Sequence, residues 1–109
     1  MAKLVRALIR EDRLTDVVNA LEQEGVDGIT LTMARGCGRH AATASFRGYP
    51  YRVLLPIAVL EVIAADATAE TLTRIIVDRA HTGHKGDGHV LILDVDQHVS
   101  VRTRWLDVA

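Results

Sequence analysis

The amino-acid sequence predicts one α+β domain over residues 1–109, a ferredoxin-like βαββαβ sandwich with an extra C-terminal strand. Three observations support this fold class. Segments in which apolar residues alternate are separated by two segments with the helical period of 3.6 residues. A long loop is predicted between the second and third strands, and the chain has no internal repeat or linker. In this order, four strands form an antiparallel sheet and both helices cover one of its faces.

The first part of the chain predicts a strand, a helix and a second strand. Residues 3–10 mix apolar and basic side chains, as is typical of a strand, and Asp12 is a candidate helix N-cap. Apolar residues then recur at the i, i+3, i+4 and i+7 spacing of one helix face: Leu14, Val17, Val18 and Leu21. Gly25 is expected to end this helix. Residues 29–34 alternate between apolar and small side chains, which predicts a strand with one buried face.

Residues 35–51 show no sustained period and contain three glycines and one proline. We therefore predict a long loop, and loops above about 12–15 residues in small domains usually have a function or lack order. This loop is expected to be mobile in the free protein and ordered by a ligand or partner.

The second half predicts a strand, a helix and two more strands. Residues 52–63 read as a long strand, with Pro56 at an edge or bulge. Asp66 is a candidate N-cap for a helix with a buried stripe. That stripe consists of Leu72, Ile75 and Ile76. Strands are expected at residues 90–93 and 98–102, with a turn between them.

Composition excludes several classes of function. The formal net charge of −1 gives no broad basic field for nucleic acid. No apolar run approaches the roughly 20 residues of a membrane span, and the charged beginning of the chain argues against a signal peptide. The one cysteine, Cys37, precludes an internal disulfide, fits the cytoplasm and is expected to be a packing residue. The predicted strands are apolar on both sides, so we expect an oligomer.

Residues 83–88, Gly-His-Lys-Gly-Asp-Gly, lie between the second helix and the next strand. Three interpretations are open: a phosphate cradle, a metal loop and a plain turn. Backbone N–H groups in a glycine-rich turn can converge on an anion, and Lys85 adds a positive charge. His81, His84 and His89 are close in sequence, but no cysteine or glutamate completes a ligand set, so we expect no metal.

Five short stretches resemble those of one known family. Residues 26–33 (VDGITLTM) resemble V-x-G-M-T-V-T-E, and residues 36–39 (GCGR) resemble G-F-G-R. Residues 46–51 (FRGYPY) resemble Y-R-G-x-x-Y, residues 82–88 resemble T-G-x-x-G-D-G, and residues 101–103 (VRT) resemble I-R-T. The family is that of the PII signal-transduction proteins, the nitrogen regulatory protein PII superfamily. The chain is thus predicted to be a divergent, PII-like member.

The resemblance implies a homotrimer that binds adenine nucleotides between subunits and regulates a protein target through the 35–51 loop. No nucleophile–base pair or paired carboxylates stand out in the sequence, so we expect no enzyme activity and no catalytic residues; the nucleotide would be an effector, and no other cofactor is expected. The residues that would line the base and sugar pocket, with their neighbours at the loop root, are Leu8, Gly28, Ile29, Thr30, Gly36, Cys37, Gly38, Arg39 and Ile63. Those that would approach phosphates and ribose from the other side are Gly86, Asp87, Gly88, His89 and Arg102.

Departures from the family pattern bear on the ligands. His89 stands where the family has a lysine after G-D-G, and Ser100 replaces the first arginine of R-x-R. Loss of two permanent charges favours ADP or AMP over ATP. His40, Ala41 and Ile57 stand where relatives hold Mg²⁺ and 2-oxoglutarate. The protein is therefore not expected to sense 2-oxoglutarate.

Two alternatives remain open for the second effector and the target. Positive or titratable side chains near the loop could serve a bicarbonate sensor linked to inorganic carbon metabolism. The candidate residues for a second ligand or for the loop are His40, Arg47, Tyr51 and Arg52, and Arg39 lies beside them. Tyr51 aligns with a tyrosine that is uridylylated in some relatives, but we expect it to be unmodified. The other alternative is a standard nitrogen-regulatory protein that acts on an ammonium transporter or a nitrogen enzyme.

Overall fold

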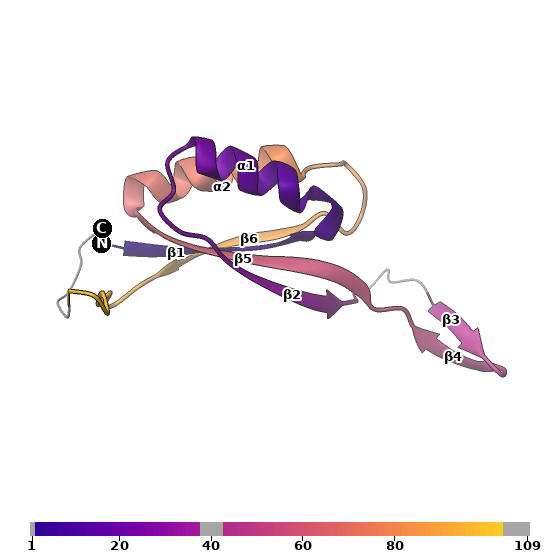
Figure 1. Ribbon diagram of the computed structural model, residues 1–109. Helices are drawn as coiled ribbons and strands as arrows, with labels where there is room; N and C mark the ends of the chain where they lie inside the picture. The colour runs from indigo at the N-terminus through magenta and orange to yellow at the C-terminus, as the bar shows by residue number, and fades with distance from the viewer. Residues whose placement is uncertain (1, 38–42, 104–109) are drawn as a thin grey trace.

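The computed structural model describes residues 2–37 and 43–103 of the chain (Figure 1). The elements are β1 (Ala2–Arg10), η1 (Glu11–Arg13), α1 (Leu14–Gln23), β2 (Thr30–Gly36), β3 (Thr43–Phe46), β4 (Tyr49–Arg52), β5 (Leu55–Ala65), α2 (Asp66–Ala80) and β6 (Gly88–Asp94). The elements follow the predicted order except that two further strands lie between β2 and β5 and that no strand follows β6 in the described residues; a short 3-10 helix, η1, precedes the first α-helix.

The predicted fold class is confirmed. In the described part of the chain, four strands form one sheet in the order β2-β5-β1-β6, and each neighbouring pair is antiparallel. Both helices lie on the same side of this sheet, as Figure 1 shows. The other side is not covered by a helix, and it is called the open face below.

The core lies between the sheet and the two helices. Strand residues alternate, so that every second side chain of β1 and β5 points toward the helices. The buried core residues are Val5, Ala7, Ile9, Val17, Leu21, Ala58, Leu60, Val62, Ala64, Ala69, Leu72, Ile76 and Ala80. In the described ranges, neither helix is long and apolar enough to cross a membrane.

The end of α1 follows the prediction. Gly25 has a positive φ of 88°, a conformation that glycine adopts without steric cost. Its N–H donates to the carbonyl of Glu22 at 3.0 Å, and the N–H of Val26 donates to the carbonyl of Leu21 at 3.4 Å. This is the Schellman arrangement, and Val26 packs against the core beyond it.

The two predicted N-caps are wrong. Asp12 lies inside η1, and its carboxylate accepts two hydrogen bonds from Arg10, at 3.2 and 3.0 Å. Asp66 is the first residue of α2 rather than its cap, and its Oδ1 lies 3.4 Å from Lys3 Nζ. In both cases an arginine or lysine from β1 interacts with the carboxylate that would have capped the helix.

The expectation of an irregular loop over residues 35–51 is wrong for residues 35–36, which end β2, and for residues 43–51, which with Arg52 form a β-hairpin. Strands β3 and β4 pair from Thr43–Arg52 to Phe46–Tyr49. Arg47 and Gly48 form the turn, with φ values of 52° and 85°, and positive φ at both positions is typical of a two-residue type I′ turn. Figure 1 shows the hairpin projecting beyond the end of the main sheet. Because residues 49–52 belong to it, β5 begins at Leu55 rather than at residue 52.

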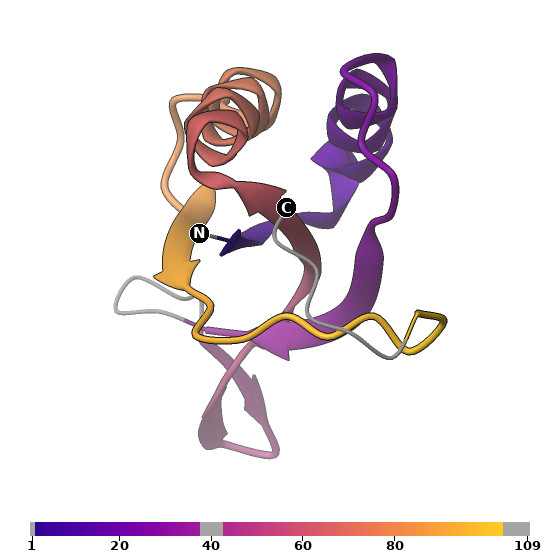
Figure 2. The same cartoon turned by 90° about the vertical axis from the view of Figure 1, so that its left-hand side faces the viewer.

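The extra C-terminal strand is also wrong for the described residues. Val99 makes a single bridge, and residues 101–103 form a turn. Figure 2 shows the segment after β6 as an extended trace that leaves the sheet. Val99 and Val101 are 53% and 93% exposed, so their alternation has no surface to pack against in one chain.

Candidate functional site

Two parts of the predicted nucleotide site, the end of β2 and the glycine-rich loop before β6, lie on opposite edges of the sheet. Gly36 ends β2, the strand at one edge, and Gly88 begins β6 at the other. Both lie at the same end of the sheet, because Gly36 pairs with Leu55 and Gly88 pairs with Ile9. Three inter-strand spacings, about 14 Å in all, separate the two edges. One chain therefore keeps β2 and the glycine-rich loop apart.

The β2 half extends along the whole strand. Thr30 begins β2 opposite Glu61, and Gly36 ends it about 20 Å away. A Cβ on Gly36 would lie 2.5 Å from Ile57 Cδ1, so the absence of a side chain keeps this contact free of a clash. Ile29 packs against the core, so its backbone rather than its side chain is available to a ligand.

Leu8, His89 and Ile63 lie on the open face. Leu8 pairs with His89 across β1 and β6, so their side chains are neighbours on that face. Ile63 pairs with Leu4 farther along β1 and is 47% exposed. The sheet thus brings together Leu8 and His89, one residue from each predicted half.

Other predicted residues lie apart from these. Cys37 is exposed just after β2, so the expectation of a packing cysteine is wrong. Arg102 is exposed in the turn at residues 101–103. Arg47 is exposed at the hairpin turn, and Tyr51 and Arg52 lie in β4. Gly38, Arg39, His40 and Ala41 fall outside the described residues.

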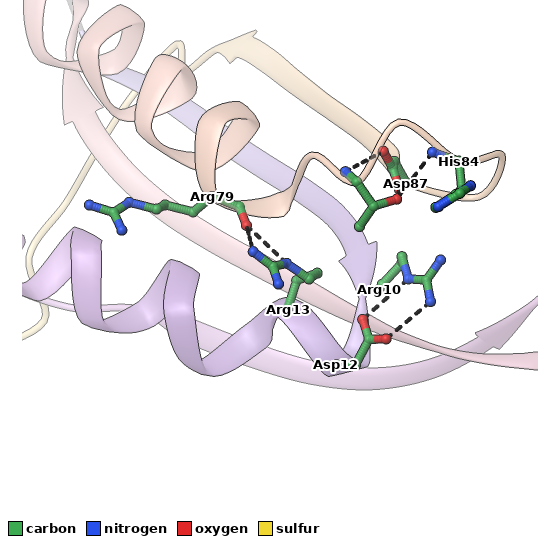
Figure 3. A network of polar contacts seen from close by, with 7 residues as sticks. Arg10, Asp12, Arg13, Arg79, His84 and Asp87 are labelled. Carbon is green, nitrogen blue, oxygen red and sulfur yellow. Dashed lines mark hydrogen bonds and ion pairs between the residues drawn. The ribbon is translucent and has the colours of Figure 1, made fainter.

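Asp87 organises the glycine-rich loop between α2 and β6 (Figure 3). Its Oδ2 accepts hydrogen bonds from the backbone N–H groups of Thr82 at 2.8 Å and Gly83 at 2.9 Å. Its Oδ1 accepts a hydrogen bond from the Thr82 hydroxyl, whose oxygen in turn accepts one from the His84 N–H at 3.2 Å. The carboxylate thus closes the loop on itself. The resemblance implies that Asp87 contacts phosphate or ribose, whereas in this structure both of its carboxylate oxygens accept hydrogen bonds from the loop itself.

These contacts hold Asp87 in its charged form. The Thr82 hydroxyl and N–H, and then the Gly83 N–H, lower the pKa of Asp87 from 3.8 to about 2. His81 Nδ1 lies 3.8 Å from the carboxylate and lowers that pKa further when protonated. The loop therefore contains a fixed negative charge that compensates part of the positive charge beside it.

Two positions of the loop, 86 and 88, favour glycine for different structural reasons. Gly86 has a φ of +93°, and nothing lies within 4 Å of where its Cβ would be, so a ligand can approach the backbone there. Gly88 has a φ of +103°, and its Cβ would lie 1.8 Å from the carbonyl oxygen of Leu8. Gly88 is therefore required for β6 to enter the sheet beside β1, whatever the loop binds.

A shallow cleft of about 180 Å³ lies beside the loop, between the end of α2 and β6. Val77, His81 and Asp87 are among the residues that line it. Pockets that enclose small ligands usually have about 300–1,000 Å³. This cleft is too small to enclose a nucleotide by itself.

The histidines of this region do not form a metal site. Within residues 2–37 and 43–103, no group of three or more His, Cys, Asp or Glu side chains is placed to hold a metal ion. His81 interacts with Asp87, and His89 is the neighbour of Leu8 on the open face.

A contact that no local sequence pattern indicates supports the base of the loop. Arg13 Nε and Nη2 donate to the backbone carbonyl of Arg79 at 3.1 and 2.8 Å (Figure 3). Arg79 lies in the last turn of α2, where carbonyl groups lack helical partners and attract positive charge. The contact ties the start of α1 to the end of α2, and its sequence separation leaves no local signal.

We expect the loop to be stable to acid down to a lower pH than an ordinary aspartate would allow. A lowered folded-state pKa contributes stability above about pH 4, and this contribution is lost as the pH falls through about 2. The measurement is an NMR titration of the Asp87 carboxyl carbon, with the Thr82 and Gly83 amide signals shifting at the same midpoint. Thr82→Ala should raise the midpoint, whereas Thr71→Ala on α2 should leave it unchanged. A midpoint near 3.8 in the unaltered protein would contradict this assignment.

Comparison with known proteins agrees with the fold. The family model "Nitrogen regulatory protein P-II" matches residues 2–105. The chain is 43% identical over 103 residues to nitrogen regulatory protein P-II 2 of Methanothermobacter thermautotrophicus, covering 93% of this chain and 90% of that protein. It is 45% identical over 103 residues to nitrogen regulatory protein GlnK2 of Haloferax mediterranei, covering 93% and 84%. The chain belongs to the nitrogen regulatory protein P-II family.

Proposed function

We propose that the protein is a trimeric P-II signalling protein, rather than an enzyme, that binds adenine nucleotides in clefts between its subunits. In this proposal ADP or AMP is favoured over ATP, 2-oxoglutarate is not sensed, and a partner protein is regulated through the 35–51 segment. The main support for this proposal is that β2 and the glycine-rich loop, which contribute to different parts of the predicted site, lie on opposite edges of one sheet. Residues from β2 of one subunit and the glycine-rich loop of another would complete each cleft.

The glycine-rich loop supports nucleotide phosphate as the ligand. Its backbone is exposed at Gly86, and the side chains of Lys85 and His89 are exposed beside it. A histidine is only partly charged near neutral pH, whereas lysine is fully charged. Ser100 supplies no charge at all. The terminal phosphate of ATP therefore gains less here than a lysine and an arginine would give.

The surroundings of Ile57 argue against a 2-oxoglutarate site. Ile57 lies on β5 opposite Ala34 and Arg10, and its side chain is half-buried against Gly36. An apolar side chain there offers no charge or hydrogen bond to a carboxylate. Burying a carboxylate without such a partner is unfavourable.

The β3–β4 hairpin is suited to reach a partner protein. It extends beyond the main sheet (Figure 1), and Arg47 and Tyr49 at its turn are exposed, Tyr49 by 77%. The names of the relatives favour a target in nitrogen regulation over the bicarbonate alternative. The latter depends partly on Arg39 and His40, which lie outside the described residues.

Calorimetric titration with AMP, ADP and ATP tests the ligand, with light scattering on the same sample to give the mass. We expect a trimer in which ADP or AMP binds at least as tightly as ATP. Adding 2-oxoglutarate to the nucleotide-loaded protein should release no further heat. If ATP binds far more tightly than ADP and AMP, or if 2-oxoglutarate releases heat, the proposed ligand preference is wrong. The protein would then be a standard 2-oxoglutarate-sensing member of the family. A stable monomer at micromolar concentration would rule out the proposed cleft.

A further inference from the structure

The two helices end in different ways. Gly25 closes α1 in a Schellman motif, in which backbone N–H groups beyond the helix return to carbonyl groups of its last turn. Helix α2 ends at Ala80 and is followed by His81 in an extended conformation, with φ of −64° and ψ of 127°. The final helical hydrogen bond of α2 runs from the His81 N–H to the Val77 carbonyl at 3.0 Å. The chain therefore leaves α2 without the glycine cap that closes α1.

The glycine-rich loop uses the N–H groups that a Schellman motif at this helix end would need. Counted from the cap at His81, the motif would place the Thr82 N–H on the carbonyl of Arg79. In this structure the Thr82 N–H instead donates to Asp87 Oδ2 at 2.8 Å, and the Gly83 N–H donates to the same atom at 2.9 Å. Closure of the loop around Asp87 thus takes from the Arg79 carbonyl the backbone donor that the motif would supply.

Arg13 supplies a donor to this carbonyl from the start of the other helix. Its Nε and Nη2 donate to the Arg79 carbonyl oxygen at 3.1 and 2.8 Å (Figure 3). A guanidinium group holds its donors in a fixed planar fork, and its positive charge is favourable at a helix C-terminus. Nη2 also lies 3.3 Å from Asp16 Oδ2, and the Arg13 side chain is 33% exposed. The guanidinium is therefore held between the two helices.

We propose that Arg13 is a positioning residue for the glycine-rich loop: it satisfies the Arg79 carbonyl and so leaves the Thr82 N–H free to close the loop around Asp87. Without Arg13, the carbonyl would compete for the Thr82 N–H, because a polar group without a partner is costly. The loop would then be open in part of the molecules. A ligand that needs the closed loop binds with an affinity reduced by the closed fraction. This inference rests on the proposed nucleotide site and adds a residue that acts on it through the loop.

The test compares Arg13→Met and Arg13→Lys with the unaltered protein, by calorimetric titration with ADP and by NMR titration of the Asp87 carboxyl carbon. Arg13→Lys keeps the positive charge and a donor but lacks the fork, so it should rescue in part. Asp16→Asn is one control, because it removes the ion pair of Arg13 and leaves the carbonyl contact. Arg74→Met is the other, because it breaks only an exposed ion pair with Glu70 on α2. Circular dichroism establishes that each variant is folded.

Arg13→Met should weaken ADP binding about tenfold and raise the Asp87 midpoint by about half a pH unit or more. The midpoint rises because the charged carboxylate loses the Thr82 N–H in part of the molecules. Arg13→Lys should lie between Arg13→Met and the unaltered protein, and both controls should match the unaltered protein. A general loss of stability would not move the midpoint in this way, since Arg13 donates to the Arg79 carbonyl rather than to Asp87. His81, 3.8 Å from that carboxylate, is protonated throughout this acid titration in every variant and does not distinguish them.

Either an unchanged Asp87 midpoint or an unchanged ADP affinity in folded Arg13→Met would overturn the inference while leaving the nucleotide site in place. If Arg13→Met does not fold, Arg13→Lys decides by the same two measurements, and a match to the unaltered protein in either of them would overturn the inference. If the unaltered protein binds none of AMP, ADP and ATP, the proposed function itself is wrong, and this inference falls with it.

Discussion

Replacing Gly88 by alanine is expected to destabilise the folded protein by about 3 kcal/mol or more. The new Cβ would lie 1.8 Å from the carbonyl oxygen of Leu8, and the φ of +103° is unfavourable for any residue with a side chain. Relief requires β6, the edge strand, to move away from β1, which breaks the hydrogen bonds between these two strands. Denaturant unfolding followed by circular dichroism measures the loss.

Gly86→Ala is the matched control for this prediction. Gly86 has a similar φ of +93°, but nothing lies within 4 Å of the position that the new methyl group would take. Only the conformational cost applies there, about 1–2 kcal/mol. Equal losses for the two variants would show that β6 can shift freely and that the close approach to Leu8 has little energetic weight.

The second large effect concerns nucleotide choice. The double variant His89→Lys with Ser100→Arg is expected to strengthen ATP binding by about 1.5–3 kcal/mol for each restored charge-assisted contact. ADP lacks the terminal phosphate and should gain less. The ratio of ATP to ADP affinity should therefore rise by at least about tenfold, which corresponds to about 1.4 kcal/mol. Calorimetric titration with both nucleotides measures it.

His84→Lys is the control for this charge effect. It adds the same positive charge to the same exposed loop, but at a position five residues before His89. A general electrostatic attraction would appear in the control as well, and it would weaken strongly with added salt. If the control shifts the ratio as much as the double variant does, the assignment of His89 and Ser100 to the phosphate contacts is wrong.

The fold was predictable where the signal is local and repeated. The apolar spacing from Leu14 to Leu21 and the strand alternation around β1 and β5 determine which faces meet in the core. Gly25 ends α1 as predicted, because its effect depends only on its own backbone and the preceding turn. These features need no knowledge of residues far away in the chain.

The predictions failed where a residue far away in the chain, or an unusual residue in a turn, determines the local structure. Asp66 was a reasonable N-cap by sequence, but the sheet places Lys3 beside it. The hairpin was missed because its turn begins with Arg47 rather than with the asparagine or aspartate that usually precedes glycine there. The strand predicted at residues 98–102 has the right alternation, yet a strand also needs a neighbour to pair with.

For the candidate site, the sequence supplies a list of candidate residues but not their arrangement in space. The order of strands, rather than any motif, separates β2 from the glycine-rich loop. Likewise, nothing in the local sequence indicates that the Asp87 carboxylate would bind the N–H groups of Thr82 and Gly83. Such contacts become visible only when the backbone path is known.

The turn of the hairpin has a thermodynamic consequence for recognition. Arg47 holds a φ of 52°, which costs roughly 1–2 kcal/mol for a residue with a side chain, and a two-stranded hairpin standing alone is only marginally stable. The paired form is then one member of an ensemble. A partner that binds only this form has its apparent affinity reduced by the fraction of molecules that populate it. If a partner binds the hairpin as proposed, residue 47 would affect the strength of that binding through this population.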